Sequence, residues 1–368
     1  MADVVLALNA GSSTLKYALY RMAAGLEERL AAATLPLALA APADVLELVL
    51  QESAKRGVGP PRSIGHRVVH GGSTFTAPVR VDPSVLENLD SLVSLAPLHL
   101  PPAIALMRQA LTRCPAALHV ACFDTAFHAT LPEVARRFAL PTPLYERGVR
   151  RYGFHGLSYE YVLSALGSPP PERLIVAHLG SGASLCAILG GRSIDTSMGL
   201  TPTGGVPMGS RSGDLDPGVV LYLQRELRYS PSQVEELLNH ASGLHGLAGS
   251  SDMSELLART AAGDATARAA VELFSYAVKK QIGAYVAALG GLDCLVFTGG
   301  IGEHAPLVRE LATRGLEPFG VQLDSVRNAQ NASTLSPSSS PCQVRIVPTD
   351  EDLVIARAAH RLAQDVQA

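Results

Sequence analysis

The pattern of apolar and polar positions at the start of the chain predicts a β-hairpin around a small polar turn. Val4–Leu8 is apolar, residues 9–16 read Asn-Ala-Gly-Ser-Ser-Thr-Leu-Lys, and residues 15–19 alternate apolar side chains with Lys16 and Ala18. Backbone N–H groups and hydroxyls with a cation behind them suit a phosphate or polyphosphate. Gly and Ser are also the usual residues of an ordinary hairpin turn, so this motif alone leaves both interpretations open.

The same pattern recurs later in the chain. Residues 174–185 can be laid over residues 4–15 without a gap, so that an apolar strand, a Gly/Ser turn and an apolar strand repeat in register, with Cys186 opposite Lys16. A third Gly-rich turn, at residues 299–303, follows the apolar run 294–297. Three such turns after strand-like runs are much stronger evidence than one. The repeat predicts two related domains, each offering a turn to one ligand between them.

The remaining pattern predicts a mixed α/β order. Helical spacing or a helix-starting proline indicates helices at residues 42–56, 83–95, 102–111, 232–239, 265–289 and 352–366. Short apolar runs predict strands at residues 64–69, 117–123, 294–297 and 344–347. Residues 329–342 read as a low-complexity loop.

Length and composition fit a two-domain globular protein. The chain has 368 residues, of which 47% are hydrophobic and 17% charged. A net charge of -3 gives no general attraction to nucleic acid or to an anionic membrane. The five cysteines are scattered, which is typical of reduced, buried thiols. No signal peptide or bilayer-spanning run is visible, and we expect a cytoplasmic protein.

Four polar clusters lie at the ends of predicted elements, at residues 65–72, 122–128, 150–156 and 208–217. Taken alone, each cluster is more typical of a surface ion pair or a structural histidine than of a site. Together they supply arginines, a histidine, carboxylates and phosphate turns, without a zinc-like cluster or a Ser/His/Asp signature. That set favours phosphoryl transfer, in which catalysis is mostly positioning and charge stabilisation.

The ordered motifs make the chain similar to the acetate kinases, in the acetate/propionate (short-chain carboxylate) kinase family. They are Asn9–Lys16 (NAGSSTLK), 65–72 (GHRVVHGG), 95–99 (LAPLH), 123–128 (FDTAFH), 151–156 (RYGFHG), 178–180 (HLG), 195–199 (DTSMG), 211–214 (RSGD), 300–303 (GIGE) and 346–349 (IVPT). Because they run from end to end in the family's order, the resemblance covers the whole chain.

The resemblance implies an α/β fold of the sugar kinase, actin and Hsp70 ATPase type, with two duplicated domains and an active-site cleft between them. We expect an N-terminal domain of residues 1–128 completed by the C-terminal helix at 353–368. Residues 129–352 would form the C-terminal, nucleotide-binding domain. The family resemblance also implies a homodimer, and we expect no nucleic-acid or membrane partner.

The resemblance further implies site residues, position by position. Catalytic roles fall to Arg67, Asp124, His155 and Arg211. The substrate site would comprise Arg67 with an alkyl pocket of Val69, Leu98, Phe154 and Pro202. Asn9 and Glu351 would hold Mg²⁺, with Mn²⁺ as the alternative ion. Contacts to ATP or ADP would come from Ser12, Thr14, Lys16, His178, Leu179, Gly180, Ser181, Gly182, Asp252, Met253, Ser254, Gly300, Ile301, Gly302, Glu303 and His304.

The implied reaction is reversible transfer of a phosphoryl group from ATP to acetate, giving acetyl phosphate and ADP. Two arginines and a metal would offset the repulsion between a carboxylate and a γ-phosphate. A carboxylate is already deprotonated at neutral pH, so no general base is needed. We therefore expect Asp124 to orient Arg67 or the metal's waters and not to move a proton.

Three departures from the family's pattern lie in the nucleotide segments. The family usually has asparagine, arginine and asparagine where this chain has Ser181, Ser254 and His304, so the identity of the phosphoryl donor stays open. Two other functions also stay open. Propionate could replace acetate, because apolar pockets discriminate by only about 1–3 kcal/mol per methylene. A non-catalytic nucleotide-binding protein of the same fold would keep the phosphate turns but would not need two substrate arginines.

Overall fold

The computed structural model describes residues 2–10, 14–36, 42–55, 58–97 and 99–365. The chain forms two compact units. Unit 1 comprises Met1–Ala129, Phe154–Tyr161 and Asp350–Ala368, and unit 2 comprises Thr130–Gly153 and Val162–Thr349. The predicted boundaries differ in assigning residues 129, 154–161 and 350–352 to the second domain, and they stay a prediction.

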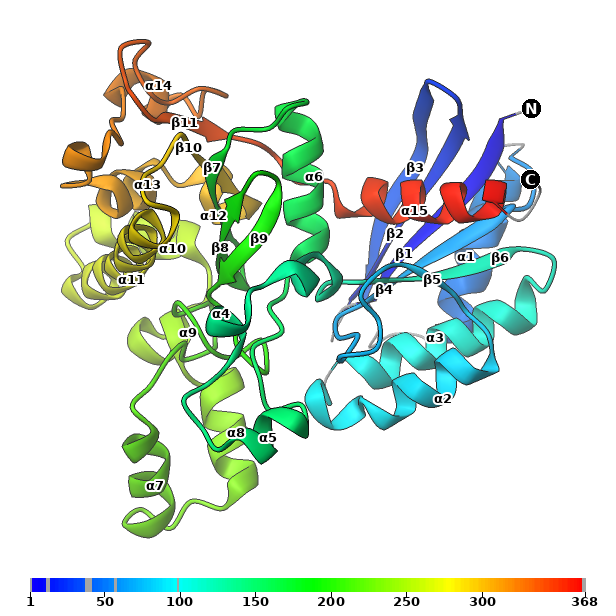
Figure 1. The fold of residues 1–368 in the computed structure, drawn as a ribbon, viewed down its shortest axis with the longest axis horizontal. Coiled ribbons are helices and arrows are strands. Elements are labelled where there is room, and N and C mark those ends of the chain that lie inside the picture. The colour runs from blue at the N-terminus through cyan, green and yellow to red at the C-terminus, as the bar shows by residue number, and fades with distance from the viewer. Residues whose placement is uncertain (1, 11–13, 37–41, 56–57, 98, 366–368) are drawn as a thin grey trace. The chain divides into compact units, whose positions relative to one another are not determined.

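Unit 1 is built on a six-stranded sheet (Figure 1). Its strand order is β3-β2-β1-β4-β6-β5. The strands are β1 (Asp3–Ala10), β2 (Thr14–Ala23), β3 (Leu26–Pro36), β4 (Ser63–Val68), β5 (Val79–Arg80) and β6 (Leu118–Phe123). Strands β1, β2 and β3 form an antiparallel meander, and β4 and β6 continue the sheet parallel to β1.

Helices cover both faces of this sheet, as the alternation along β1 requires. Val5 and Ala7 pack against α15 (Glu351–Asp365), the last helix of the chain. Leu6 and Leu8 face the other way, into a cluster with α1 (Pro42–Lys55) and α3 (Leu100–Arg113). Figure 1 shows α15 lying across the strands. The other helical elements of this part are α2 (Pro83–Ser91), η2 (Val93–Leu95), η3 (Ala126–Thr130) and α6 (Gly156–Leu166), which continues into unit 2.

Unit 2 repeats the same strand topology. Its five-stranded sheet has the order β11-β10-β7-β8-β9, with β7 (Arg173–Leu179), β8 (Ala183–Leu189), β9 (Arg192–Thr196), β10 (Cys294–Thr298) and β11 (Gln343–Ile346). Here too an antiparallel meander, β7-β8-β9, is extended by two parallel strands on the side of its first strand. The α/β fold with two duplicated domains, expected from the repeated hairpin, is confirmed.

The helices of unit 2 surround this sheet. They are α4 (Glu133–Arg136), α5 (Thr142–Glu146), α7 (Pro217–Arg225), α8 (Pro231–His240), α9 (Gly243–Ala248), α10 (Met253–Ala261), α11 (Ala265–Leu289), α12 (Gly299–His304), α13 (Pro306–Thr313), η4 (Glu317–Phe319) and α14 (Ser325–Ala329). The N-terminal caps of α8 and α11 show why these helices begin where they do. Ser230 and Gln233 form a capping box at α8, and the Asp264 carboxylate accepts two backbone N–H groups at α11. Helix α11 ends at Gly290, whose φ of +68° is left-handed.

Most of the elements expected from the sequence are confirmed, with two differences. The Gly-rich segment after β10 is a short helix, α12, where a turn was expected. The low-complexity segment near residue 330 begins in α14 and lies against β11 through a bridge between Thr334 and Arg345. All five cysteines are free, four of them buried and Cys114 half-buried.

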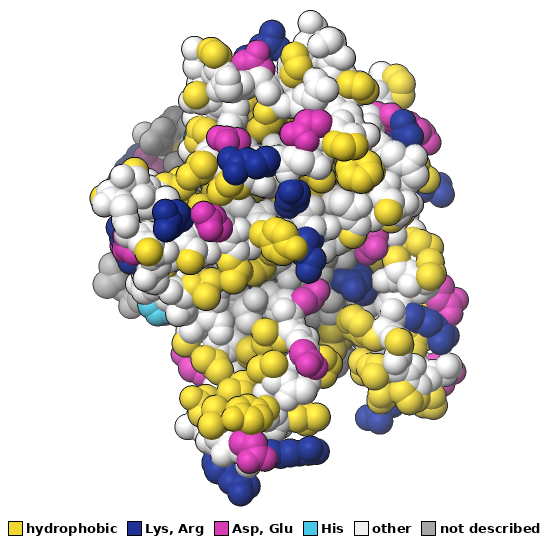
Figure 2. All heavy atoms as spheres, turned by 90° about the vertical axis from the view of Figure 1, so that its left-hand side faces the viewer, with side chains coloured by type: hydrophobic (Ala, Val, Ile, Leu, Met, Phe, Trp, Pro, Cys, Tyr) yellow, Lys and Arg dark blue, Asp and Glu magenta, His cyan; other side chains and the backbone are white. Residues whose placement is uncertain are grey.

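Helix α7 has an unusually exposed apolar surface. None of its residues is buried, and Tyr222 keeps 57% of its surface exposed, with Val219 and Leu221 beside it. Figure 2 shows hydrophobic side chains gathered on the lowest lobe of the molecule, where Figure 1 places α7. No helix within the described ranges is long and apolar enough to cross a membrane.

Gly65 of β4 allows α15 to approach the sheet. A Cβ at this position would lie 2.4 Å from Ile355 Cγ2 and 2.9 Å from the Ile355 carbonyl oxygen. We therefore expect Gly65→Ala to destabilise unit 1 by about 1–3 kcal/mol, the usual effect of overpacking. Urea unfolding followed by circular dichroism measures this, with Gly59→Ala as the control because nothing lies within 4 Å of its added Cβ. Equal urea midpoints for both variants would contradict the close approach of α15.

Candidate active site

Three of the predicted site residues lie at one edge of the unit 1 sheet. Asn9 is near the end of β1, Arg67 near the end of β4, and Asp124 directly follows β6. Because these neighbouring strands are parallel, their carboxyl ends meet at the same edge, which is where α/β proteins bind their ligands. Glu351, the first residue of α15, joins them although it is 342 positions from Asn9.

Arg67 is the centre of this group. Its guanidinium donates from Nε and Nη2 to the two carboxylate oxygens of Asp124, at 2.9 and 2.6 Å, and from Nη1 to Asn9 Oδ1 at 3.0 Å. Glu351 Oε2 accepts from Asn9 Nδ2 at 3.4 Å and lies 3.9 Å from Arg67 Nε. The bidentate pairing fixes the plane of the guanidinium as well as its position.

Burial shapes the electrostatics of these groups. Desolvation opposes the charge on Arg67, but the carboxylates of Asp124 and Glu351 outweigh it and raise the pKa of the guanidinium. Desolvation also raises the pKa of Glu351, against the opposing effect of Arg67. Burial, with the negative charges of Glu351 and Asp350, raises the pKa of Asp352 to about 6. This edge of the sheet therefore holds more negative charge than its own cations neutralise.

That surplus of carboxylates fits a divalent cation. Within the described residues, Asp352 Oδ1 is buried without a hydrogen-bond partner, and no three His, Cys, Asp or Glu side chains converge as a complete cage. Mg²⁺ is usually held by one or two carboxylates together with substrate phosphates and water, and an all-protein cage is uncommon. Glu351, Asn9 and the neighbouring Asp352 offer oxygens of the right kind.

The predicted phosphate turn is described only in part. Lys16 lies directly opposite Asn9 in the register of β1 and β2, and Thr14 begins β2. Lys16 is exposed, and its charge partly opposes the rise that burial causes in the pKa of Glu351 and of Asp352. Ser12 and Leu98 lie outside the described residues.

A strained loop lies beside Asp124. His155 has φ +57°, a left-handed conformation that is uncommon for histidine and costs free energy. The next residue, Gly156, donates its N–H to the Asp124 carbonyl oxygen at 2.9 Å, and a Cβ there would lie 2.2 Å from that oxygen. Phe154 and Val69 are both buried in the same unit. The loop at His155 is therefore hydrogen-bonded to Asp124, the residue that also binds Arg67.

In unit 2, strand pairing brings two of the predicted nucleotide segments together. Residues 178–182 span the end of β7 and the turn to β8, and β10 pairs with β7 so that Thr298 lies opposite His178. Gly299 follows with φ +78°, and a Cβ there would lie 2.7 Å from the Leu179 carbonyl oxygen. Its N–H donates to Glu303 Oε1 at 2.9 Å, inside α12. Leu179 is buried, whereas Ser181 and His304 are exposed. The side chains of Ser181 and His304 are therefore accessible to a ligand, and that of Leu179 is not.

The third nucleotide segment lies next to the turn at Ser181. A Cβ on Gly209 would be 3.3 Å both from the Ser181 carbonyl oxygen and from Ser251 Cβ, so this glycine lies between the two segments. Asp252 starts α10 by accepting the backbone N–H of Ser254 at 2.8 Å. Met253 is buried in the core, whereas Asp252 and Ser254 are exposed.

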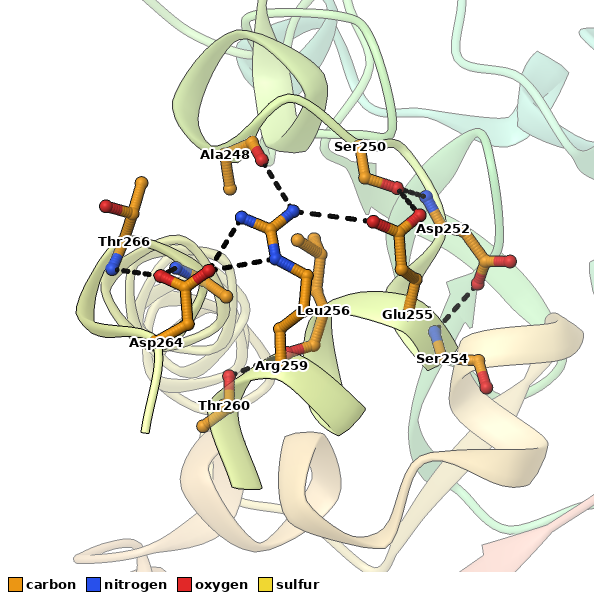
Figure 3. A network of polar contacts seen from close by, with 11 residues as sticks. Ala248, Ser250, Asp252, Ser254, Glu255, Leu256, Arg259, Thr260, Asp264 and Thr266 are labelled. Carbon is orange, nitrogen blue, oxygen red and sulfur yellow. Dashed lines mark hydrogen bonds and ion pairs between the residues drawn. The ribbon is translucent and has the colours of Figure 1, made fainter. Parts of the chain in front are cut away.

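The arginine nearest to Ser254 along α10 is already engaged. Arg259 donates to Asp264 Oδ2 at 2.9 Å and to the Ala248 carbonyl oxygen at 2.9 Å, and it reaches Glu255 Oε1 at 3.4 Å (Figure 3). Figure 3 shows the Ser254 side chain directed away from this network. Arg259 therefore does not replace the arginine that the family usually carries at position 254.

Arg211 and Pro202 are also brought together in unit 2. Arg211 Nη1 donates to the Pro202 carbonyl oxygen at 3.1 Å and lies 3.7 Å from Met208 Sδ. The backbone here depends on Gly243, whose added Cβ would lie 2.2 Å from the Met208 carbonyl oxygen. Arg211 is half-buried and held by uncharged groups in these two contacts, unlike Arg67 with its carboxylates.

Sequence reasoning missed two acidic neighbours of Glu351, namely Asp350 and Asp352. The expected terminal helix began at Asp352, and only Glu351 was assigned a role. The run Asp350-Glu351-Asp352 after an apolar strand was the signal that could have identified them, because three adjacent carboxylates at a helix start are costly unless cations face them.

Comparison with known proteins agrees with this geometry. The model of the acetokinase family matches residues 38–357. An acetate kinase of Streptomyces avermitilis is 44% identical over 392 residues, covering 97% of each chain, and one of Rhodopseudomonas palustris is 50% identical over 82% of this chain and 77% of its own.

Two solved structures resemble the whole chain. A propionate kinase from Francisella tularensis has a TM-score of 0.90 at 34% identity, and an acetate kinase from Porphyromonas gingivalis has a TM-score of 0.89 at 35% identity. Each comparison covers 98% of this chain and 99% of the other. Sequence and fold thus agree on one family, and the chain belongs to the acetokinase family, phosphotransferases with a carboxyl group as acceptor.

Proposed function

We propose that this protein transfers a phosphoryl group reversibly between ATP and acetate. An acetate oxygen forms a bond to the γ-phosphorus while the bond to the β,γ-bridging oxygen breaks, and the electron pair of that bond leaves with ADP. No proton is transferred, because the attacking carboxylate is already ionised at neutral pH. Since ATP is made and used in the cytoplasm, we place the reaction there. The observation that carries the proposal is Arg67, held by both oxygens of Asp124 beside Asn9 and Glu351.

Phosphoryl transfer is catalysed mainly by positive charge and by positioning of the reactants. Arg67 supplies positive charge that offsets the repulsion between two anions, and the family resemblance assigns the same role to Arg211. Asp124 keeps the Arg67 guanidinium in one plane, which is a positioning role and not proton transfer. His155, held in its strained conformation next to Gly156, donates a hydrogen bond to the group in flight. The family resemblance assigns the alkyl group to Val69, Leu98, Phe154 and Pro202, and Val69 and Phe154 are buried apolar residues of unit 1.

Asn9 and Glu351 would hold Mg²⁺, and Mn²⁺ would substitute for it. A bound divalent ion neutralises the phosphate oxygens and helps to align them. The family resemblance assigns the phosphates to Lys16, Ser12 and Thr14, of which Lys16 is exposed and lies opposite Asn9 in the pairing of β1 and β2. In unit 2, residues 178–182, 252–254 and 300–304 bind the nucleotide, and Gly299 gives them close backbone approach.

Propionate is the second candidate acceptor. A propionate kinase shares this fold at a TM-score of 0.90. One methylene changes binding in an apolar pocket by only about 1–3 kcal/mol, so a single enzyme of this kind discriminates weakly between the two acids.

Trapping of acyl phosphate tests the proposal. Purified protein with ATP, Mg²⁺, acetate and hydroxylamine should yield acetohydroxamate, and propionate should give the corresponding product. Absence of hydroxamate with either acid would favour a non-catalytic nucleotide-binding protein instead. Arg67→Ala and Arg211→Ala should each lower turnover by ~10²–10³, because each removes a charged donor from the transition state.

Two controls sharpen this experiment. Arg80→Ala removes an exposed arginine of unit 1 and should leave turnover unchanged. Arg67→Lys should recover little activity, because lysine lacks the planar fork that Asp124 holds. Near-wild-type turnover in either alanine variant would remove that arginine from the mechanism.

Ser254 should weaken the hold on the nucleotide. An arginine at this position would offer a stacking plane and up to five donors, and Arg259 is engaged elsewhere. We expect Ser254→Arg to lower the KM for ATP with little change in kcat, the signature of restored uniform binding. Steady-state kinetics with ATP, GTP and ITP measure this, and Ser232→Arg controls for the added charge. An unchanged KM for ATP, or a strong preference of the wild type for ATP over GTP, would refute the role of Ser254.

The exposed apolar face of α7 suits a second copy of the chain, and we propose a homodimer. Val219, Leu221 and Tyr222 are too exposed for a helix that remains in water alone. Light scattering should give twice the 38.5 kDa of one chain, and Tyr222→Glu should shift it toward 38.5 kDa. Val134→Glu, on an isolated exposed valine of the same unit, should leave the dimer intact. A monomeric wild type would refute the proposal.

A further inference from the structure

Three side chains from distant parts of unit 1 meet at the start of α15. Asp350 Oδ1 accepts from the Tyr20 hydroxyl at 3.3 Å, and Asp350 Oδ2 pairs with the Arg29 guanidinium. The Arg29 guanidinium also lies 5.8 Å from the centre of the Tyr20 ring, close enough for a cation–π contact. Asp350 is thus bound by one residue of β2 and one of β3.

A β-bulge is what brings Arg29 to this face of the sheet. In the pairing of β2 with β3, Leu19 lies opposite Ala31 but Tyr20 lies opposite Arg29, so Leu30 is an extra residue. Side chains alternate between faces, and a one-residue shift moves each later side chain to the other face. Leu30 and Ala31 both pack with the cluster of α1 and α3, while Tyr20 packs with α15. Without the bulge, Arg29 would point away from Asp350.

Asp350 in turn fixes the first turn of α15. Its Oδ1 accepts the backbone N–H of Leu353 at 3.1 Å, the bond by which a capping aspartate starts a helix. Because Glu351 is the next residue, the orientation of this cap decides where the Glu351 carboxylate lies. That carboxylate accepts from Asn9 Nδ2 at 3.4 Å.

The positive charge of Arg29 has a second effect, on the repulsion among the acidic residues at the start of α15. Asp350, Glu351 and Asp352 are three consecutive acids, and the last two are largely buried. Arg29 neutralises the first of them, and Lys16 acts on the other two. Without Arg29, repulsion among the three carboxylates would favour a displaced first turn of α15.

We propose that Arg29, together with Tyr20, is a positioning residue for the metal end of the active site, because it anchors Asp350 and thereby holds Glu351 against Asn9. The inference rests on the proposed function, in which Glu351 and Asn9 hold the divalent ion. It assigns a role to a half-exposed arginine on β3, which touches neither substrate nor metal.

Binding of Mn²⁺ in the presence of ADP tests this directly, by electron paramagnetic resonance titration of the full chain. Arg29→Met should weaken Mn²⁺ binding by about 10-fold or more, the usual effect of losing a group that orients a metal ligand. The Mg²⁺ concentration for half-maximal activity should rise in parallel, with the KM for acetate little changed. Arg29→Lys should recover part of the metal affinity, because it restores one charge facing Asp350.

The matched control is Arg21→Met. Arg21 lies on β2 next to Tyr20 and pairs with Glu28 at 2.6 Å, an exposed contact that does not involve Asp350. It should bind Mn²⁺ as the wild type does. Equal metal affinity for Arg29→Met and the wild type, or an equal loss in Arg21→Met, would overturn the inference.

Two further measurements keep the outcome clear. If Arg29→Met does not fold, Tyr20→Phe removes only the hydroxyl bound to Asp350, and it should still weaken Mn²⁺ binding; unchanged binding would overturn the inference. The proposed function is judged separately, by hydroxamate formation in the wild type. An active wild type whose variants all bind Mn²⁺ equally would therefore refute the positioning role alone.

Discussion

The pairing of Arg67 with Asp124 is the interaction on which the rest of the site depends. A guanidinium that is mostly removed from water needs a matching charge and partners for its N–H groups, and Asp124 provides the charge and two parallel hydrogen bonds. Removing one partner of such a pair typically costs about 3–5 kcal/mol, because a buried charge is left uncompensated. The strained loop at His155 is bonded to the backbone of the same aspartate. The pair therefore links the ends of β4 and β6 to the loop at His155.

Helix α15 extends this arrangement to the end of the chain. Gly65 of β4 lets the helix approach the sheet closely, and its first residue, Glu351, reaches Asn9 of β1. The unit that begins with the first strand is thus completed by the last helix. A loss of packing under α15 would displace Glu351 from Asn9 as well as destabilise the fold, so the stability of unit 1 and the geometry at this end of the sheet are coupled.

Much of the site in unit 1 could be predicted from the sequence because its residues lie at or near the ends of strands. Asn9 and Asp124 follow short apolar runs, Arg67 lies near the end of a predicted strand, and parallel strands bring such ends together. Strand β3 was not predicted, because Leu26–Pro36 is rich in Leu, Glu and Ala and lacks clear alternation. Its strand conformation comes from pairing with β2, which overrides local preference. The bulge at Leu30, and with it the place of Arg29, depends on that register, which no local pattern specifies.

The duplicated topology allows corresponding positions of the two units to be compared, and their residues differ in chemistry. Val5 pairs with Ser63 in the first sheet, and the corresponding Ile175 pairs with Leu295 in the second. Four residues further along each partner strand stand Arg67 and Gly299. The same place in the fold thus holds a charged side chain in unit 1 and, in unit 2, a left-handed glycine against the Leu179 backbone. Likewise Lys16 is exposed on β2, whereas Cys186, its counterpart on β8, is buried. One scaffold therefore carries charged side chains at these positions in unit 1 and close contact between backbone segments in unit 2, through substitutions at a few strand ends.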